Sequence, residues 1–195
     1  VYRGAERPAR SLVPPSLPLY TPATGEPESV EAALALLDAA GHPRGVGLAE
    51  IELLHSADDT ERAVAEAIAA RLRDQLGLIV RPAPQEFRVF LDSQRKLKYQ
   101  MCLATWIGDY PDPSNFLDLF ASDSSANRTG WQDPQYDVLL RAAAAISEPA
   151  QRSTRLAEAE RLLMQRGPIA PISFRGQANL IDPGIAGFHD NLLDL

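Results

Sequence analysis

The segment 106–123 holds the densest group of side chains that could do chemistry, with four aspartates among aromatic residues. Trp106, Asp109 and Tyr110 place one carboxylate between an indole and a phenol. A carboxylate forms charge-assisted hydrogen bonds to an ammonium group, and an aromatic ring offers its π face to a cation. This group therefore suits a cationic or zwitterionic ligand.

Two other roles remain open for these aspartates. An Asp that follows a Gly and precedes Tyr-Pro, as Asp109 does, is commonly a turn residue that accepts backbone N–H bonds. Asp109 and Asp112 could also form an acid/base pair, or join Asp118 and Asp123 around a hard cation such as calcium. The spacing of these aspartates does not follow the calcium-loop pattern.

Motifs that mark common enzyme and metal sites are absent from the sequence. There is no phosphate-binding P-loop, G-x-S-x-G elbow, H-E-x-x-H helix or spaced CxxC pair. His42, His55 and His189 lie far apart, which favours structural or surface roles, and Cys102 is the sole cysteine. We therefore expect no metal, no cofactor and no enzymatic activity.

The composition is that of a globular protein with an acidic balance. The chain has 195 residues, 45% of them hydrophobic, and a formal net charge of −7 without a block of Lys or Arg. Nucleic acid and anionic membrane surfaces are therefore poor partners. No apolar run reaches the roughly 18 residues of a membrane helix. Because the chain starts at Val1 without a methionine, we expect it to be a piece of a longer protein.

The chemical group must be positioned by a strand and the turn that follows it. Residues 99–106 form a short apolar run typical of a buried strand, and Gly108, Pro111 and Pro113 then enforce a turn. Ser114 is expected to cap a helix over residues 115–120. In open α/β sheets ligands bind beyond the carboxyl ends of strands, so the turn is where a cleft is expected.

The remaining pattern alternates strands and helices, which predicts an α/β fold with a βαβ unit and a parallel crossover. The last strand contains Pro171, which suits an edge position. The expected strands are 49–55, 78–81 and 169–174, and the expected helices are 29–41, 58–77, 86–95, 136–146 and 149–165.

Six stretches in a fixed order resemble the C-terminal part of the family 5 extracellular solute-binding proteins, the oligopeptide, dipeptide and nickel receptors of ABC importers. Each stretch alone is only moderately specific. They are the Pro-rich entry 12–20, LLDAAGHPRG within 32–47, the helix 61–78 ending in QLGL, WIGDYPDPSNF at 106–116, GWQDPQYDVLL at 130–140 and PIAPIS at 168–173.

The resemblance implies a type II periplasmic-binding-protein fold in which two α/β lobes close on a ligand, with a mixed sheet flanked by helices. This chain resembles the second lobe. The implied organisation is a Pro-rich crossing segment at 1–27, the ligand-binding lobe at 28–178 and a return segment toward the first lobe at 179–195.

The resemblance also implies roles and partners. In peptide-binding members the aspartate at the position of Asp109 pairs with the peptide's α-ammonium, Trp106 matches a cleft aromatic, and the backbone near Ile107 pairs with an extended peptide. The implied partners are a peptide or other small solute and an ABC permease. The implied protein is a monomer, periplasmic or extracellular, peripheral to the membrane, with a lipid anchor supplied by an upstream segment.

The sequence departs from some oligopeptide receptors in the strand before Trp106. It reads QMCLAT, without the Arg that would bind a peptide carboxylate, and Arg95 is out of register. Opines, short peptides, sugars and metal chelates therefore all stay open as ligands. Two other function classes also stay open: a ligand-sensing domain of a cytoplasmic transcription regulator, and a hydrolase built on Asp109 and Asp112.

Overall fold

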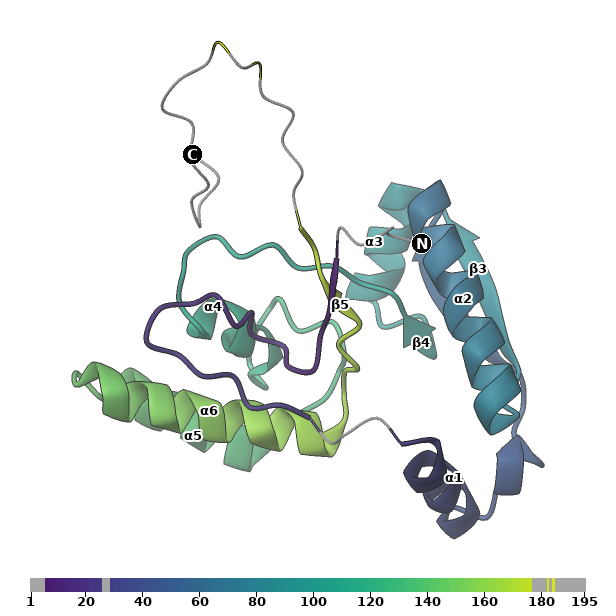
Figure 1. Cartoon of the computed structure of the whole chain (residues 1–195), viewed down its shortest axis with the longest axis horizontal. Coiled ribbons are helices and arrows are strands. Elements are labelled where there is room, and N and C mark those ends of the chain that lie inside the picture. Colours follow the sequence, from purple (N-terminus) through teal and green to yellow (C-terminus); the bar gives the residue numbers. More distant parts are fainter. Residues whose placement is uncertain (1–5, 26–28, 177–181, 183, 185–195) are drawn as a thin grey trace. The chain divides into compact units, whose positions relative to one another are not determined.

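The computed structural model describes residues 6–25, 29–176, 182 and 184 (Figure 1). These residues form two compact units, one within 29–105 and the other from 6–25 together with 106–176. The Pro-rich entry thus packs with the C-terminal half of the chain. Most of the segment 179–195 lies outside the described residues, and the predicted boundaries after residues 27 and 178 stay predictions.

The first unit is built on a parallel sheet with the strand order β3-β2-β4. The central strand β2 buries Leu53, Leu54 and His55 in succession, as expected of a strand covered on both faces. The elements are α1 (Val30–Ala39), η1 (Pro43–Gly45), β2 (Ile51–Ser56), α2 (Asp59–Leu76), β3 (Val80–Gln85), α3 (Phe87–Arg95) and β4 (Met101–Cys102).

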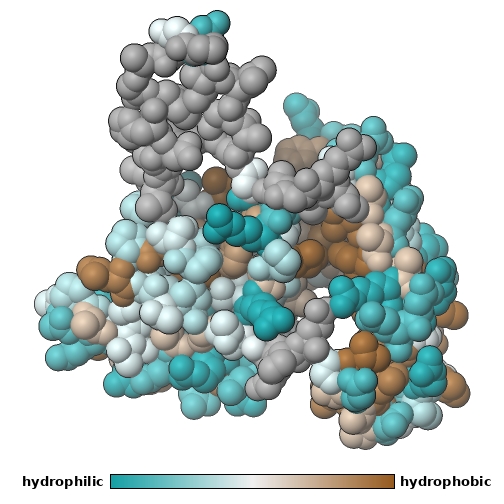
Figure 2. All heavy atoms as spheres, in the orientation of Figure 1, coloured by the Kyte–Doolittle hydropathy of each residue, from teal (hydrophilic) through white to brown (hydrophobic). Residues whose placement is uncertain are grey.

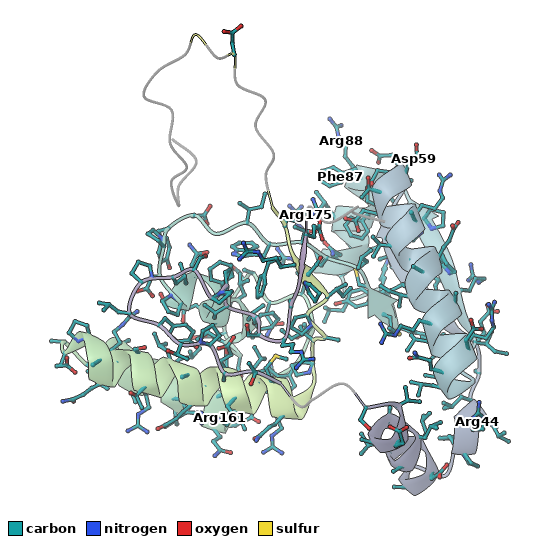
Figure 3. All side chains as sticks on the ribbon, viewed as in Figure 1. Arg44, Asp59, Phe87, Arg88, Arg161 and Arg175 are labelled. Carbon is teal, nitrogen blue, oxygen red and sulfur yellow. The ribbon has the colours of Figure 1, made fainter. Side chains whose placement is uncertain are left out.

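The helices of this unit begin and end where the sequence predicts. Asp58 caps α2 by accepting a bond from the Glu61 N–H, and Gly77 ends α2 in the left-handed conformation. Figure 3 shows Asp59 and Phe87, the first residues of α2 and α3, at the same end of the unit. The predicted parallel βαβ unit is therefore confirmed.

Three predicted strands have wrong limits. The strand predicted at 169–174 forms only at Ser173–Phe174, so Pro171 lies outside it. The run 99–106 forms a strand only at Met101–Cys102, because β4 pairs with β2 over just two residues. The strand predicted at 78–81 is Val80–Gln85 and continues through Pro82 and Pro84. Proline is tolerated there because β3 lies at the edge of the sheet, where a missing N–H donor breaks no pairing.

The surface of α1 is unusually apolar for an exposed helix. No residue of α1 is buried, and Leu36 is 73% exposed. Figure 2 shows the corresponding brown side chains over α1. The helix therefore carries apolar side chains that are only partly covered within its own unit.

The second unit is a helical pair covered by the N-terminal segment. The helices α5 and α6 pack together, and a short antiparallel pairing of β1 with β5 joins Arg7 to Phe174. The elements are β1 (Arg7–Pro8), α4 (Ser114–Leu117), η2 (Asp118–Phe120), α5 (Pro134–Ala144), α6 (Pro149–Arg166) and β5 (Ser173–Phe174).

A buried carboxylate lies in the core of this unit. Glu160 of α6 is 0% exposed. Its Oε1 accepts bonds from the N–H groups of Leu12 and Val13 at 3.0 and 2.8 Å. Its Oε2 accepts bonds from the Tyr20 hydroxyl and the Ala23 N–H at 2.8 and 2.7 Å. Burial raises the pKa of the Glu160 carboxyl, and the four donors oppose that shift.

We expect Glu160→Gln to lower the free energy of unfolding by about 2–4 kcal/mol, because an amide nitrogen would replace one accepting oxygen and leave buried donors unpaired. Chemical denaturation measures this change. The matched control is Glu158→Gln, whose carboxylate makes an exposed pair with Arg155 on the same helix and contributes less than about 1 kcal/mol. Equal losses in the two variants would show that the buried contacts do not hold the N-terminal segment.

Candidate functional site

The predicted site residues lie on one exposed loop of the second unit, between the end of β4 and α4. Trp106, Ile107 and Tyr110 are 45%, 80% and 48% exposed, and Asp109 is also exposed. Residues 106–109 make no backbone hydrogen bond to any other described residue. The loop therefore presents side chains and unpaired backbone groups together.

The buried side-chain amide of Asn115 holds the loop through two hydrogen bonds. Asn115 in α4 is 5% exposed; its Oδ1 accepts a bond from the Trp106 indole N–H at 3.1 Å, and its Nδ2 donates to the Tyr110 carbonyl at 3.4 Å. Gly108 passes close to the same helix, because a Cβ there would lie 3.0 Å from Cζ of Phe116. The indole is thus fixed although much of its surface is open to solvent.

Asp112 ties the far end of the loop to α6. The Arg152 guanidinium donates to both carboxylate oxygens, at 2.7 and 2.9 Å. This pairing holds the pKa of the Asp112 carboxyl at about 2, well below its ordinary value. Asp112 also accepts a bond from the Ser114 N–H at 2.9 Å.

The predicted cap at Ser114 is therefore wrong. The helix α4 begins at Ser114 itself, and the residue before it is Pro113, which makes no side-chain cap bond. Asp112 supplies the oxygen that satisfies the first N–H of the helix, because its carboxylate reaches two residues forward as in an Asx turn.

Asp109 differs from Asp112 in having no bound neighbour. Its carboxylate makes no hydrogen bond or ion pair with the part of the chain that the structure describes. The turn role proposed for Asp109 from sequence is thus carried out by Asp112, which accepts the Ser114 N–H bond. Asp112 also accepts two bonds from Arg152. An acid/base pair of the two aspartates is disfavoured as well, since Asp112 stays ionised near neutral pH.

The other candidate ligands of a metal do not gather. In the described ranges no three His, Cys, Asp or Glu side chains converge as metal ligands. His55 is buried in β2, His42 bonds the Val46 carbonyl, and His189 lies outside the described residues. The Cys102 thiol is partly buried against Gln94, and burial raises its pKa.

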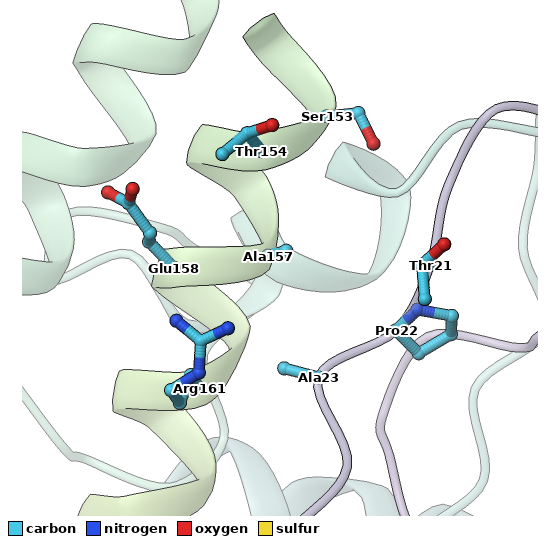
Figure 4. A pocket seen from close by; sticks show the side chains of 8 residues that line it. All are labelled: Thr21, Pro22, Ala23, Ser153, Thr154, Ala157, Glu158 and Arg161. Carbon is cyan, nitrogen blue, oxygen red and sulfur yellow. The ribbon is translucent and has the colours of Figure 1, made fainter. Parts of the chain in front are cut away.

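Two hollows lined by described residues of the second unit do not include the predicted site. The larger, of about 390 Å³, lies between α6 and residues 21–23 and is lined by Thr154, Glu158 and Arg161 among others (Figure 4). The smaller, of about 200 Å³, lies between η2 and α5. The predicted site residues themselves are exposed on the loop.

Sequence reasoning missed two residues that support the loop, Asn115 and Arg152. Arg152 is 40 positions from Asp112, and only the packing of α6 beside α4 brings the two together. Asn115 follows Ser114 at a helix start, where Asn is ordinarily read as a surface residue. Among the described helices, none is long and apolar enough to cross a membrane.

The chain is similar in sequence to known proteins. Residues 1–128 match the family model described as bacterial extracellular solute-binding proteins, family 5 Middle. The dipeptide-binding protein DppE of Bacillus subtilis is 36% identical over 140 residues, which are 72% of this chain and 26% of that protein. The periplasmic murein peptide-binding protein MppA of Escherichia coli is 31% identical over 192 residues, 95% of this chain and 36% of that protein.

The solved structures agree with the sequence relatives. The unliganded open form of MppA superposes with a TM-score of 0.83 at 31% identity, over 91% of this chain and 36% of that one. The predicted type II periplasmic-binding-protein fold is thereby confirmed. The chain spans about a third of the length of this structure.

The Asp112 and Arg152 pair predicts acid sensitivity. Because the folded pKa lies below the unfolded value, the pair stabilises the fold above about pH 4, and this stabilisation is lost as the pH falls toward 2. After a discount for solvent screening we expect the loss to be about 1 kcal/mol. Denaturant unfolding of the wild type and of Asp112→Asn between pH 7 and 2 measures it.

The control is Asp92→Asn, which removes an exposed pair with Lys96 and should change the pH dependence much less. Parallel pH profiles for the wild type and Asp112→Asn would contradict the assignment.

Proposed function

Because the chain belongs to family 5 of the bacterial extracellular solute-binding proteins, we propose that it forms the peptide-contacting part of the substrate-binding component of an ABC importer. The chain spans 26% and 36% of the length of the two relatives compared above. Peptide binding by a whole receptor is therefore part of this proposal. Those relatives are named for binding a dipeptide and a murein peptide.

The unpaired carboxylate of Asp109 on an exposed loop is the observation that carries this proposal. An ionised group without a partner is free to pair with a ligand's ammonium, and the neighbouring Trp106 and Tyr110 rings add contact area. Asp112, the next carboxylate, is already satisfied by Arg152. The loop therefore offers one free negative charge beside two exposed rings.

The unpaired backbone of residues 106–109 supports an extended peptide as the ligand. Main-chain N–H and C=O groups that lack partners can pair with a peptide laid alongside, as a strand adds to a sheet edge. Binding through the main chain gives affinity for many side chains. In this proposal Ile107 contributes its backbone, Asp109 binds the N-terminal ammonium, and Trp106 and Tyr110 flank the first residue.

Membership of the same family supports a proposal for the wider context. The protein acts outside the cytoplasm, in the periplasm or at the cell surface with a lipid anchor, and delivers its ligand as a monomer to permease subunits in the membrane. It performs no covalent chemistry, because closure of two lobes on the ligand is sufficient for capture and release.

For the full-length receptor we expect Asp109→Asn to weaken a peptide by about 2–5 kcal/mol, the loss typical of a charge pair that becomes buried on binding. Isothermal titration of an unmodified peptide measures the loss. The same peptide with an acetylated N-terminus is the control, because it lacks the ammonium and should bind both proteins equally. Unchanged affinity for the unmodified peptide would remove Asp109 from the site.

We also expect residues 1–195 alone to bind the same peptide more weakly than micromolar, because one lobe provides only part of the cleft and no closure energy. Titration of this chain beside the full-length receptor tests the expectation. Micromolar or tighter binding by the 195 residues would mean that the loop itself is a complete site.

A further inference from the structure

The support of the loop by Asn115 has a defined chemistry. An indole N–H can only donate and a backbone carbonyl can only accept, so contact with both fixes the orientation of the Asn115 amide. The amide is 95% buried, and both of its ends are occupied within the loop. Asn115 therefore specifies the position of Trp106 relative to the Tyr110 carbonyl.

One further bond and the contacts of its neighbours keep Asn115 itself in place. Its backbone N–H donates to the Asp112 carbonyl at 3.1 Å, and Asp112 is held in turn by Arg152 of α6. The ring of Phe116, 9% exposed, packs under Gly108 and belongs to the core. The loop is thus connected through α4 to the most buried part of the unit.

We infer that Asn115 is a positioning residue that fixes the Trp106 ring before any ligand arrives. This inference rests on the proposed function, since it assumes that the loop meets a peptide. When a side chain already has its bound orientation, binding does not have to supply the free energy of ordering that side chain. The apparent affinity is higher because a larger fraction of the protein is competent to bind.

The same bond limits how Trp106 recognises a ligand. The indole has one hydrogen-bond donor, and Asn115 occupies it. Trp106 therefore meets the ligand with its ring surface alone and favours a cationic group or a flat apolar group over one that needs a donor. The charge of Asp109 favours the cationic group of these two.

The test uses the intact receptor labelled with ¹⁵N-tryptophan. A separate Trp106→Phe variant identifies the Trp106 indole resonance, because that resonance is missing from its spectrum. Asn115→Leu removes both bonds at similar volume. We expect the solvent exchange of the Trp106 indole proton to rise about fivefold or more, the factor that corresponds to about 1 kcal/mol for one hydrogen bond. We expect the Kd for an unmodified peptide to rise by a similar factor.

Asn115→Asp is the second variant, since it retains the oxygen that accepts the indole proton. Its Trp106 exchange should stay near the wild-type rate even if Asn115→Leu folds poorly. The control is Asn127→Ala, which removes another loop-holding amide, one that donates to the Trp131 carbonyl. This variant should lower the melting temperature without changing Trp106 exchange or the peptide Kd.

The two readouts separate the inference from the proposed function. A wild-type receptor that binds no peptide overturns the proposed function, while indole exchange still decides whether Asn115 holds Trp106. Faster exchange in Asn115→Leu with an unchanged peptide Kd overturns the positioning role. Fast exchange in Asn115→Asp as well would show that the oxygen alone does not hold the indole and that the bond to the Tyr110 carbonyl is needed.

Discussion

The second unit depends on the carboxylate of Glu160 and the four donors around it. A carboxylate at 0% exposure is stable only when its oxygens are saturated, and here the donors all come from residues 12–23. A Pro-rich segment with few backbone pairings of its own is thereby attached to α6. The side chains of Val13, Leu17 and Tyr20 then complete the hydrophobic core.

The helix α6 links this anchor to the candidate site. Arg152, Leu156 and Glu160 follow one another at four-residue intervals, so they lie along one face of the helix. Arg152 holds the loop, Leu156 fills the core, and Glu160 holds the N-terminal segment. One helix therefore holds both the loop and the N-terminal segment.

The two aspartates of the loop have different environments: Asp112 is paired with Arg152, and Asp109 is exposed to solvent. Asp112 is paired with Arg152 and keeps a low pKa, whereas Asp109 has no partner among the residues described. This contrast is the physical reason to assign binding to Asp109 and scaffolding to Asp112. Sequence spacing alone treats the two as equivalent carboxylates.

Local signals in the sequence were sufficient for most of the helices and for the choice of the candidate loop. Capping residues such as Asp58 and Asp133 and the terminating glycines Gly77 and Gly167 mark the helices, because their chemistry acts within a few residues. The resemblance of WIGDYPDPSNF to family 5 identified the loop. Both kinds of information are contained in short stretches of chain.

The supporting contacts were not predictable because they join distant parts of the chain. The partners of Glu160 are 137 to 148 positions away, and Arg152 is 40 positions from Asp112. A Glu within the apolar stripe of α6, between Ala159 and Leu163, is a local sign of a buried charge, but it does not identify the donors. The short pairing of β4 likewise depends on β2, and no property of residues 99–106 reports it.

Native mass spectrometry of the full-length protein tests most directly whether the loop with Asp109 binds a peptide. The protein is purified without denaturation, and small molecules carried in the cleft are detected as added mass. We expect a ladder of peptide-sized adducts that Asp109→Asn loses. A single non-peptide mass, such as a sugar or a metal chelate, retained by Asp109→Asn, would contradict it.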